Sequence, residues 1–446
     1  MKSLLKLLSS LVIIMLLLLS VACIFNNYAD DDDKKLNDET LKETVLTVAS
    51  FNLNIDFILL DLITEFNHSN PLYQIEIVDY YDHSLEDKGL SKLVTDIITG
   101  NAPDIFVIRN LPYRQYASRG LFEDLYSYID SDPDLNRSDI VDSILTANEV
   151  DGGLYRISPL FAISTAIGGV SVVGIDNGWN MDEFISVMNA NPQADIPVGA
   201  WAGNYEMLFR NFLLLGMDDY VDWSKGETFF DTESFINLLE LSVAFIGNGN
   251  PMSNPEDRAP VSILSGRQIL YIDGYITAYQ HIQTYQGVFG GDIAFKGFPT
   301  NERNGNSFNT SFALAMSSTS SHKDGAWAFL RTMLMKEWQL KSYQDFPRGF
   351  PTNKNVLNEI LSNPDYHNGV AGWNDLQFET EPPSQAELEW FMSFINSIER
   401  IEYEHDALVD MVFEGVSDYF NGLKTAEEAA RIIQSRASIY VAEISG

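Results

Sequence analysis

The segment between residues 45 and 108 alternates between two hydrophobic periods, and this alternation is the strongest constraint on the fold. Residues 45–50 and 73–79 have the pattern of strands, and 104–108 is a short apolar run, typical of a strand covered on both faces. After the first strand, apolar residues recur at the spacing of one buried helical face: Ile55, Ile58, Leu59, Leu62, Ile63 and Phe66. Strand, helix, strand, helix, strand predicts an α/β lobe with a mainly parallel sheet.

Helical patterns recur later in the chain. We expect helices over residues 179–190, 205–215, 232–246 and 324–338. The C-terminal helix has the clearest start, because Thr425 and Glu428 form a capping box. Its predicted buried face carries Ala426, Ala429, Ala430, Ile433, Ala437, Tyr440, Val441 and Ile444.

The first residues have the pattern of a secretion signal. Lys2 and Lys6 precede an apolar core at 7–19, which is short for a membrane-spanning helix. Ser20-Val21-Ala22-Cys23 then resembles a bacterial lipobox, with Ser20 where leucine is usual. We expect residues 1–22 to be a signal peptide, Cys23 to carry lipid, and the polar residues 23–43 to form a flexible tether. An ordinary cleaved signal with an incidental cysteine is the alternative.

Charge and cysteine content exclude several classes of function. Cys23 is the only cysteine among 446 residues, so the chain has neither an intramolecular disulfide nor a thiolate metal cluster. The net charge of -35 repels nucleic acid. The six histidines show no metal-ligand helical spacing, and Asp130, Asp132 and Asp134 begin like a calcium loop that lacks the later glycine and glutamate. We therefore expect no metal and no cofactor, and interpret 130–134 as a solvated turn.

Several blocks after residue 44 resemble family 1 extracellular solute-binding proteins, the group that includes maltose-binding proteins. Each block alone is weakly specific, but they follow the family's order: 93–105 with its Gly100-Asn101-Ala102-Pro103-Asp104 turn, 116–125, 151–159, 298–330 and 419–425. The resemblance implies a periplasmic-binding-protein-like fold of type II, in which two α/β lobes, each with a mainly parallel sheet flanked by helices, are joined by hinge crossings. It implies lobe 1 at 44–158 and 297–338, and lobe 2 at 159–296 and 339–446.

The resemblance also implies a function. Members of this family capture a carbohydrate between the lobes and deliver it to ABC permease subunits with their ATPase. For this chain we therefore expect a monomer, not an enzyme, held by Cys23 at the extracellular face of the bacterial cytoplasmic membrane. A secreted glycoside-active enzyme, a lipoprotein for another polar solute, and a surface adhesin or scaffold remain alternatives.

Sugar recognition requires flat aromatic faces and fixed polar groups, and in parallel sheets ligands bind beyond the carboxyl ends of the strands. In the first lobe these loops carry Asn52, Asn54, Tyr81, Asp82, Arg109 and Asn110. In the second lobe we select Trp201, flanked by small residues, together with Asn204, Asp273, Tyr275 and Trp373. Asn309, in the segment where the chain returns to the first lobe, is a further candidate. Asn54 could instead only cap its helix, and Arg109 could pair with a surface acid.

Overall fold

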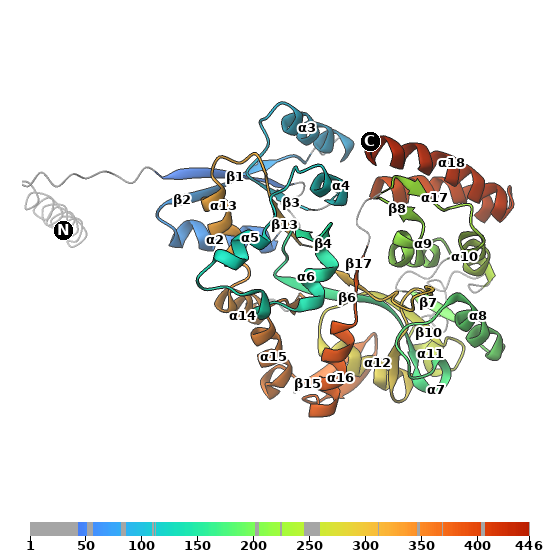
Figure 1. Cartoon of the computed structure of the whole chain (residues 1–446). Helices are drawn as coiled ribbons and strands as arrows, with labels where there is room; N and C mark the ends of the chain where they lie inside the picture. Colours follow the sequence, from blue (N-terminus) through green and yellow to red (C-terminus); the bar gives the residue numbers. More distant parts are fainter. Residues whose placement is uncertain are drawn as a thin grey trace, which may run out of the picture. The chain divides into compact units, whose positions relative to one another are not determined.

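The computed structural model describes residues 43–50, 57–81, 86–108, 111, 113–200, 205–223, 225–244, 259–310, 312–345, 348–367, 369–402 and 406–445. Figure 1 follows these residues from the first strand to the last helix. Residues 44–446 form one unit with two main sheets.

The first main sheet has the strand order β13-β3-β1-β2. Its strands are β1 (Thr44–Ser50), β2 (Tyr73–Asp79), β3 (Ile105–Val107) and β13 (Leu314–Met316). Strand β1 runs parallel to β2 and β3, and only β13 is antiparallel to its neighbour. The prediction of a mainly parallel first sheet, with helices between its first strands, is therefore confirmed.

Apolar residues hold helices against both faces of this sheet. Leu59, Leu62, Ile63 and Phe66 of the predicted stripe are buried in one core cluster with Leu46 of β1. A second cluster includes Ala49 of β1 and Leu93. The elements of this region are α2 (Phe57–Ser69), α3 (Glu86–Ile98), α4 (Tyr113–Ser118), α5 (Tyr126–Ser131), η1 (Arg137–Asp139), α6 (Asp142–Asn148), β4 (Glu149–Val150), β5 (Gly153–Leu154), α13 (Lys323–Thr332) and α14 (Lys336–Asp345).

The second main sheet is built around β6, whose residues are all buried. The order β17-β12-β6-β10-β7 is extended by β11 and β14, which also pair with β6. The strands that pair with β6 all run antiparallel to it; they are β10, β11, β12 and β14. Strand β7 pairs in parallel with β10, and β17 pairs in parallel with β12. The prediction of a mainly parallel second sheet is thus wrong, because this central strand runs against the others. The strands are β6 (Leu160–Gly169), β7 (Val198–Ala200), β10 (Leu270–Ile276), β11 (Ile293–Phe295), β12 (Ser307–Asn309), β14 (Phe350–Pro351) and β17 (Arg400–Ile401).

Two further core clusters lie against the second sheet. One joins Ala166 of β6 to the C-terminal helices, and the other joins Ile163 and Ile167 to α12 and α16. The remaining elements are α7 (Val170–Val173), α8 (Met181–Ala190), α9 (Tyr205–Gly216), η2 (Met217–Asp219), β8 (Val221–Asp222), β9 (Glu227–Thr228), α10 (Glu233–Ala244), α11 (Val261–Leu264), α12 (Tyr279–Phe289), α15 (Lys354–Ser362), η4 (Pro364–Tyr366), β15 (Gly369–Trp373), β16 (Leu376–Thr380), α16 (Gln385–Asn396), α17 (Asp406–Phe420) and α18 (Ala426–Ser445).

The C-terminal helix confirms its predicted cap. Glu428 accepts a hydrogen bond from the Thr425 backbone N–H at 3.0 Å, and Thr425 Oγ1 accepts one from the Glu428 N–H at 3.2 Å. On the predicted face, the buried residues are Ala426, Ala429, Ala430, Ile433, Ala437 and Val441, while Tyr440 packs partly against them.

The helix predicted over 324–338 is in fact two helices, and Trp338 belongs to the second one, α14. Between them, the N–H groups of Leu334 and Met335 donate to carbonyls three residues back, which tightens and ends α13. Gln339 Nε2 donates to the Met333 carbonyl at 2.9 Å. The break is stable because the Gln339 side chain gives the Met333 carbonyl the donor that a continuous helix would supply.

The chain returns to the first sheet later than predicted. The expected boundaries place residues 297–338 in the first lobe, but Phe298 packs in a core of the second sheet and β12 pairs with β6. Strand β13 is the first element after β12 that pairs in the first sheet, with β3. The predicted start at 297 is therefore one strand too early, while the other lobe boundaries stay predictions.

Candidate functional site

The second sheet has a common carboxyl edge at which several strands end. The register aligns Asn309 of β12 with Ala162 and Ile276 of β10 with Ile163, both near the start of β6. Strand β7 runs parallel to β10, and β17 runs parallel to β12, so both end on the same side. The loops and side chains that follow β7, β10, β12 and β17 are therefore brought to one edge, where ligands of such sheets bind.

A polar cluster occupies this edge. Asn309 Nδ2 donates to Glu402 Oε2 at 2.7 Å and lies 3.4 Å from the Gly274 carbonyl. Ser164 Oγ lies 2.6 Å from Glu402 Oε2 and 2.8 Å from the same Gly274 carbonyl. Glu402 is half-buried, so these hydrogen bonds keep its carboxylate in one orientation. The cluster joins β6, β10 and β12 to the residue that follows β17.

Asp273 and Tyr275 lie on an irregular turn next to this cluster. The pairing of β10 with β6 shifts between Asp273 and Ile276, and Asp273 Oδ1 accepts the Tyr275 N–H at 2.8 Å. The other Asp273 oxygen accepts the Tyr285 hydroxyl. Burial, followed by the charge of Asp273, raises the pKa of Tyr285 well above its usual value, so this hydroxyl remains a donor. Asp273 thereby holds the turn that presents Tyr275.

Tyr275 is an exposed aromatic residue at this edge, with 46% of its surface accessible. Its hydroxyl donates to the Arg348 carbonyl at 3.3 Å. The Arg348 guanidinium lies 5.2 Å from the ring centroid of Phe57, which begins α2 of the first lobe and is 52% exposed. Arg348 thus contacts one exposed aromatic residue from each lobe, and both rings offer apolar faces to a ligand.

Trp373 lies in an aromatic cluster behind this edge. Its ring centroid is 4.5 Å from that of Tyr271, with the planes at 66°, and 5.3 Å from that of Tyr285, with the planes at 90°. The indole therefore supports the tyrosine that bonds Asp273. Its role as a ligand contact stays a prediction.

The other predicted ligand residues are distributed as follows. Tyr81 is half-buried two residues after the end of β2, at the carboxyl end of a first-lobe strand, and its N–H donates to Asp79 Oδ1 at 2.9 Å. The candidates that lie outside the described residues are Asn52, Asn54, Asp82, Arg109, Asn110, Trp201, Asn204 and the predicted lipidation site Cys23.

Sequence reasoning missed Ser164, Glu402 and Phe57. Ser164 had a detectable signal, because a hydroxyl pair with Thr165 interrupts the otherwise apolar stretch 160–169. Glu402 had no such signal in the sequence. Strand β17 has only two residues, too few for a recognisable strand pattern, and Glu402 is one of several acidic residues in this segment. Phe57 is at the start of an apolar helix, where a core position was the natural interpretation.

The acidic segment at 130–134 is neutralised by arginines instead of a metal. Asp130 pairs with Arg137, and Arg331 binds Asp132 through two hydrogen bonds and Asp134 through one. The Asp132 side chain is only 3% exposed, so the prediction of a solvated turn is wrong for this residue. Within the described residues, no group of three or more His, Cys, Asp or Glu side chains is arranged to hold a metal ion.

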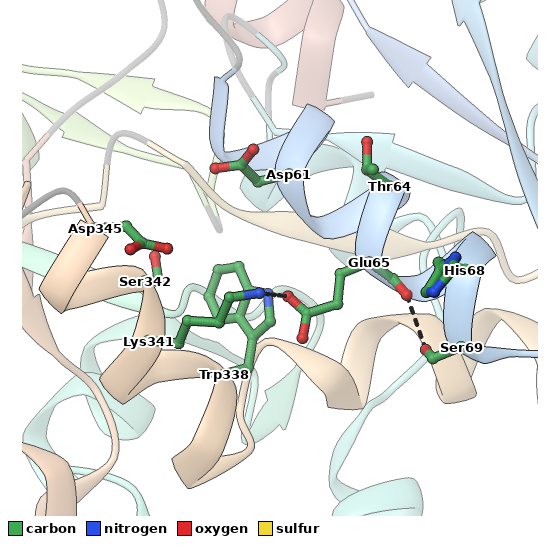
Figure 2. A pocket seen from close by; sticks show the side chains of 9 residues that line it. All are labelled: Asp61, Thr64, Glu65, His68, Ser69, Trp338, Lys341, Ser342 and Asp345. Atoms are coloured by element: carbon green, nitrogen blue, oxygen red, sulfur yellow. Dashed lines mark hydrogen bonds and ion pairs between the residues drawn. The ribbon is translucent and has the colours of Figure 1, made fainter.

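A separate cavity of about 490 Å³ lies between α2 and α14. Figure 2 shows Lys341 reaching from α14 to Glu65 of α2, with the Trp338 indole behind this ion pair. None of the predicted ligand residues lines the cavity. Because its central charges neutralise each other at 2.8 Å, we place the candidate ligand site at the carboxyl edge instead.

The fold is shared with solved sugar-binding proteins. The sugar-binding protein MalE from Xanthomonas citri is 15% identical, with a TM-score of 0.58 over 90% of this chain and 98% of that one. A periplasmic oligogalacturonide-binding protein from Yersinia enterocolitica is 14% identical, with a TM-score of 0.55 over 90% and 100% of the chains. An ABC substrate-binding protein from Listeria monocytogenes in complex with cycloalternan is 16% identical, with a TM-score of 0.52 over 89% and 99%.

The remaining comparisons concern the sequence itself. No curated protein matches the chain. Among the described residues, no helix has both the length and the apolar character needed to cross a membrane. The model of a protein family described as bacterial extracellular solute-binding protein matches residues 61–371, which include strands of both main sheets. By this match, the chain belongs to the bacterial extracellular solute-binding protein family.

Proposed function

We propose that this protein captures a carbohydrate, such as an oligosaccharide, between its two lobes and delivers it to the permease of an ABC importer. Cys23 carries the lipid that holds the protein at the extracellular face of the membrane. The protein binds its ligand reversibly and catalyses no reaction. Closure of the lobes is favoured only by contacts that the ligand makes to both of them at once.

The observation that carries this proposal is the group formed by Asn309, Glu402 and Tyr275. An amide and a carboxylate held 2.7 Å apart present fixed hydrogen-bonding groups for adjacent sugar hydroxyls. The exposed ring of Tyr275 offers a flat apolar face for the C–H side of a sugar ring. Family membership and the carbohydrates named for the cycloalternan and oligogalacturonide binders support the same ligand class.

A thermal-shift screen tests the proposal. A chain that starts at Ile24 is heated with maltooligosaccharides, cyclic glucans, oligogalacturonides and monosaccharides, each in separate samples. We expect one class to raise the melting temperature, since a ligand at 100 times its Kd stabilises by about 2.7 kcal/mol. Stabilisation by none of them argues against a carbohydrate ligand, and release of reducing sugar from any of them supports the enzyme alternative.

Asn309→Ala tests the site. This change removes the amide that donates to Glu402 and leaves the carboxylate with one partner fewer. A neutral hydrogen bond from this amide to a sugar hydroxyl contributes about 0.5–1.5 kcal/mol, so we expect the affinity for the carbohydrate found in the screen to fall roughly 2- to 13-fold. Isothermal titration calorimetry measures it. The control is Asn396→Ala, at an exposed position of α16, and equal affinities for the two variants contradict the site.

A further inference from the structure

A second polar cavity lies at the opposite edge of the second sheet. It has a volume of about 370 Å³, within the range of small-molecule sites. Asn306 and Glu399 line this cavity and immediately precede β12 and β17. At the other edge of the sheet, Asn309 is the last residue of β12 and Glu402 follows β17. The cavity is therefore separated from the carboxyl-edge site by the length of these strands.

One wall of this cavity is an ordered loop between Gly297 and Asn306. The Phe298 N–H donates to the Gly305 carbonyl at 2.9 Å, and the Thr300 N–H donates to the Trp179 carbonyl at 3.0 Å. A Cβ on Gly305 would lie 1.9 Å from the Phe298 carbonyl oxygen, so only glycine fits there. The loop is thus held in one conformation without a ligand, and little ordering entropy opposes binding.

The lining also contains Trp390 of α16. Its ring is half-buried and lies nearly parallel to Phe295, with the centroids 5.4 Å apart and the planes at 19°. Phe394 stacks on Phe295 as well, at 4.3 Å. This stack fixes the indole plane, so the ring can contact a sugar ring with little loss of side-chain freedom.

The polar groups of the lining favour a neutral ligand. Arg303 already pairs with Glu183, and Asn304 Nδ2 donates to Glu399 Oε2 at 2.9 Å. Glu302 and Ser393 also line the cavity, and their side chains form no hydrogen bond or ion pair with another described residue. Two carboxylates beside one neutralised arginine disfavour an anion, whereas hydroxyl groups can donate to the carboxylates and accept from Ser393.

We propose that this amino-edge cavity is a second binding site for a small neutral polyhydroxylated compound of monosaccharide size. Trp390 supplies the apolar contact, and Glu302, Asn304 and Ser393 supply the hydrogen bonds. The site lies away from the carboxyl edge and is occupied independently of it. Its existence does not depend on the identity of the transported ligand.

The test observes Trp390 directly by ¹⁹F NMR of protein labelled with 5-fluorotryptophan, with its resonance assigned by Trp390→Phe. The probes are D-glucose, D-galactose and N-acetyl-D-glucosamine, titrated one at a time. We expect at least one probe to shift the Trp390 resonance in a saturable manner. Ser393→Tyr, which fills the cavity from an exposed position, should abolish the shift, whereas Asn396→Tyr on the same helix and outside the lining should retain it.

Three outcomes overturn the proposal. The first is the absence of a saturable shift with all three probes, and the second is an equal shift in the Ser393→Tyr variant. The third is loss of the shift in Tyr275→Ala, a carboxyl-edge variant, because the signal would then report binding at that edge. The first two results leave carbohydrate capture at the carboxyl edge untouched, whereas the third would support binding at that edge, which calorimetry of Asn309→Ala measures separately.

Discussion

Arg331→Met is expected to lower the free energy of unfolding by about 3 kcal/mol, the lower end of the range for breaking a buried ion pair. The Asp132 side chain is 3% exposed and accepts two hydrogen bonds from Arg331, at 2.7 and 2.8 Å. Methionine keeps an apolar stem but leaves this carboxylate without its counter-ion. The loss stays at the lower end because Trp327 Nε1 and the Asp134 N–H still donate to Asp132.

Urea denaturation at neutral pH measures this loss. The control is Lys341→Met, because Lys341 and Glu65 are 60% and 40% exposed and such pairs contribute about 0–1 kcal/mol. Equal losses in the two variants contradict the argument from burial.

Acidification provides a second readout of the Arg331–Asp132 pair. Burial alone would raise the pKa of Asp132, but hydrogen bonds from Arg331, the Asp134 backbone and Trp327 lower it below its usual value. The folded state therefore gains stability from this carboxylate above its unfolded pKa of about 3.9, and loses it as the pH falls through the folded pKa. The difference between wild type and Arg331→Met should accordingly shrink at acid pH.

Trp179→Ala is expected to cost about 3–5 kcal/mol of unfolding free energy, as for other large aromatic residues removed from a core. Trp179 is 1% exposed, and its ring packs edge-on against Phe184 with centroids 5.1 Å apart. The indole Nε1 donates to the Gly297 carbonyl at 3.1 Å, at the base of the loop that forms one wall of the amino-edge cavity. The variant therefore loses both a core side chain and a hydrogen bond to that loop.

Trp179→Phe separates these two contributions. Phenylalanine retains an aromatic ring but leaves the buried Gly297 carbonyl without its donor, which costs about 1–3 kcal/mol. We expect chemical denaturation to place Trp179→Phe between wild type and Trp179→Ala. If the alanine variant is no less stable than the phenylalanine variant, the cavity contribution is absent and the packing argument fails.

The candidate site could be predicted only in part. The sequence predicts Asp273 and Tyr275 at a strand end and Asn309 as a further polar candidate, and the structure brings them to one edge of the second sheet. Ser164 and Glu402 complete that cluster, yet they are 238 residues apart. No local pattern joins residues at this separation, because their proximity depends on the pairing of β6 and β17 with β12. The packing of Trp373 against Tyr271 and Tyr285 likewise joins residues far apart in the sequence, so no local pattern indicates it.

Local periodicity was sufficient to define the α/β class, the strand Tyr73–Asp79, the buried stripe of α2 and the capping box of α18. Each of these depends on residues within a few turns or one strand of each other. The direction of β6 and the break after α13 depend on partners elsewhere in the chain. A fully buried strand satisfies its hydrogen bonds in either direction. The break after α13 is set by Gln339, which bonds the Met333 carbonyl while Thr352 and Asn353 hold its amide in place. Those choices therefore became fixed only when the sheets and helices packed together.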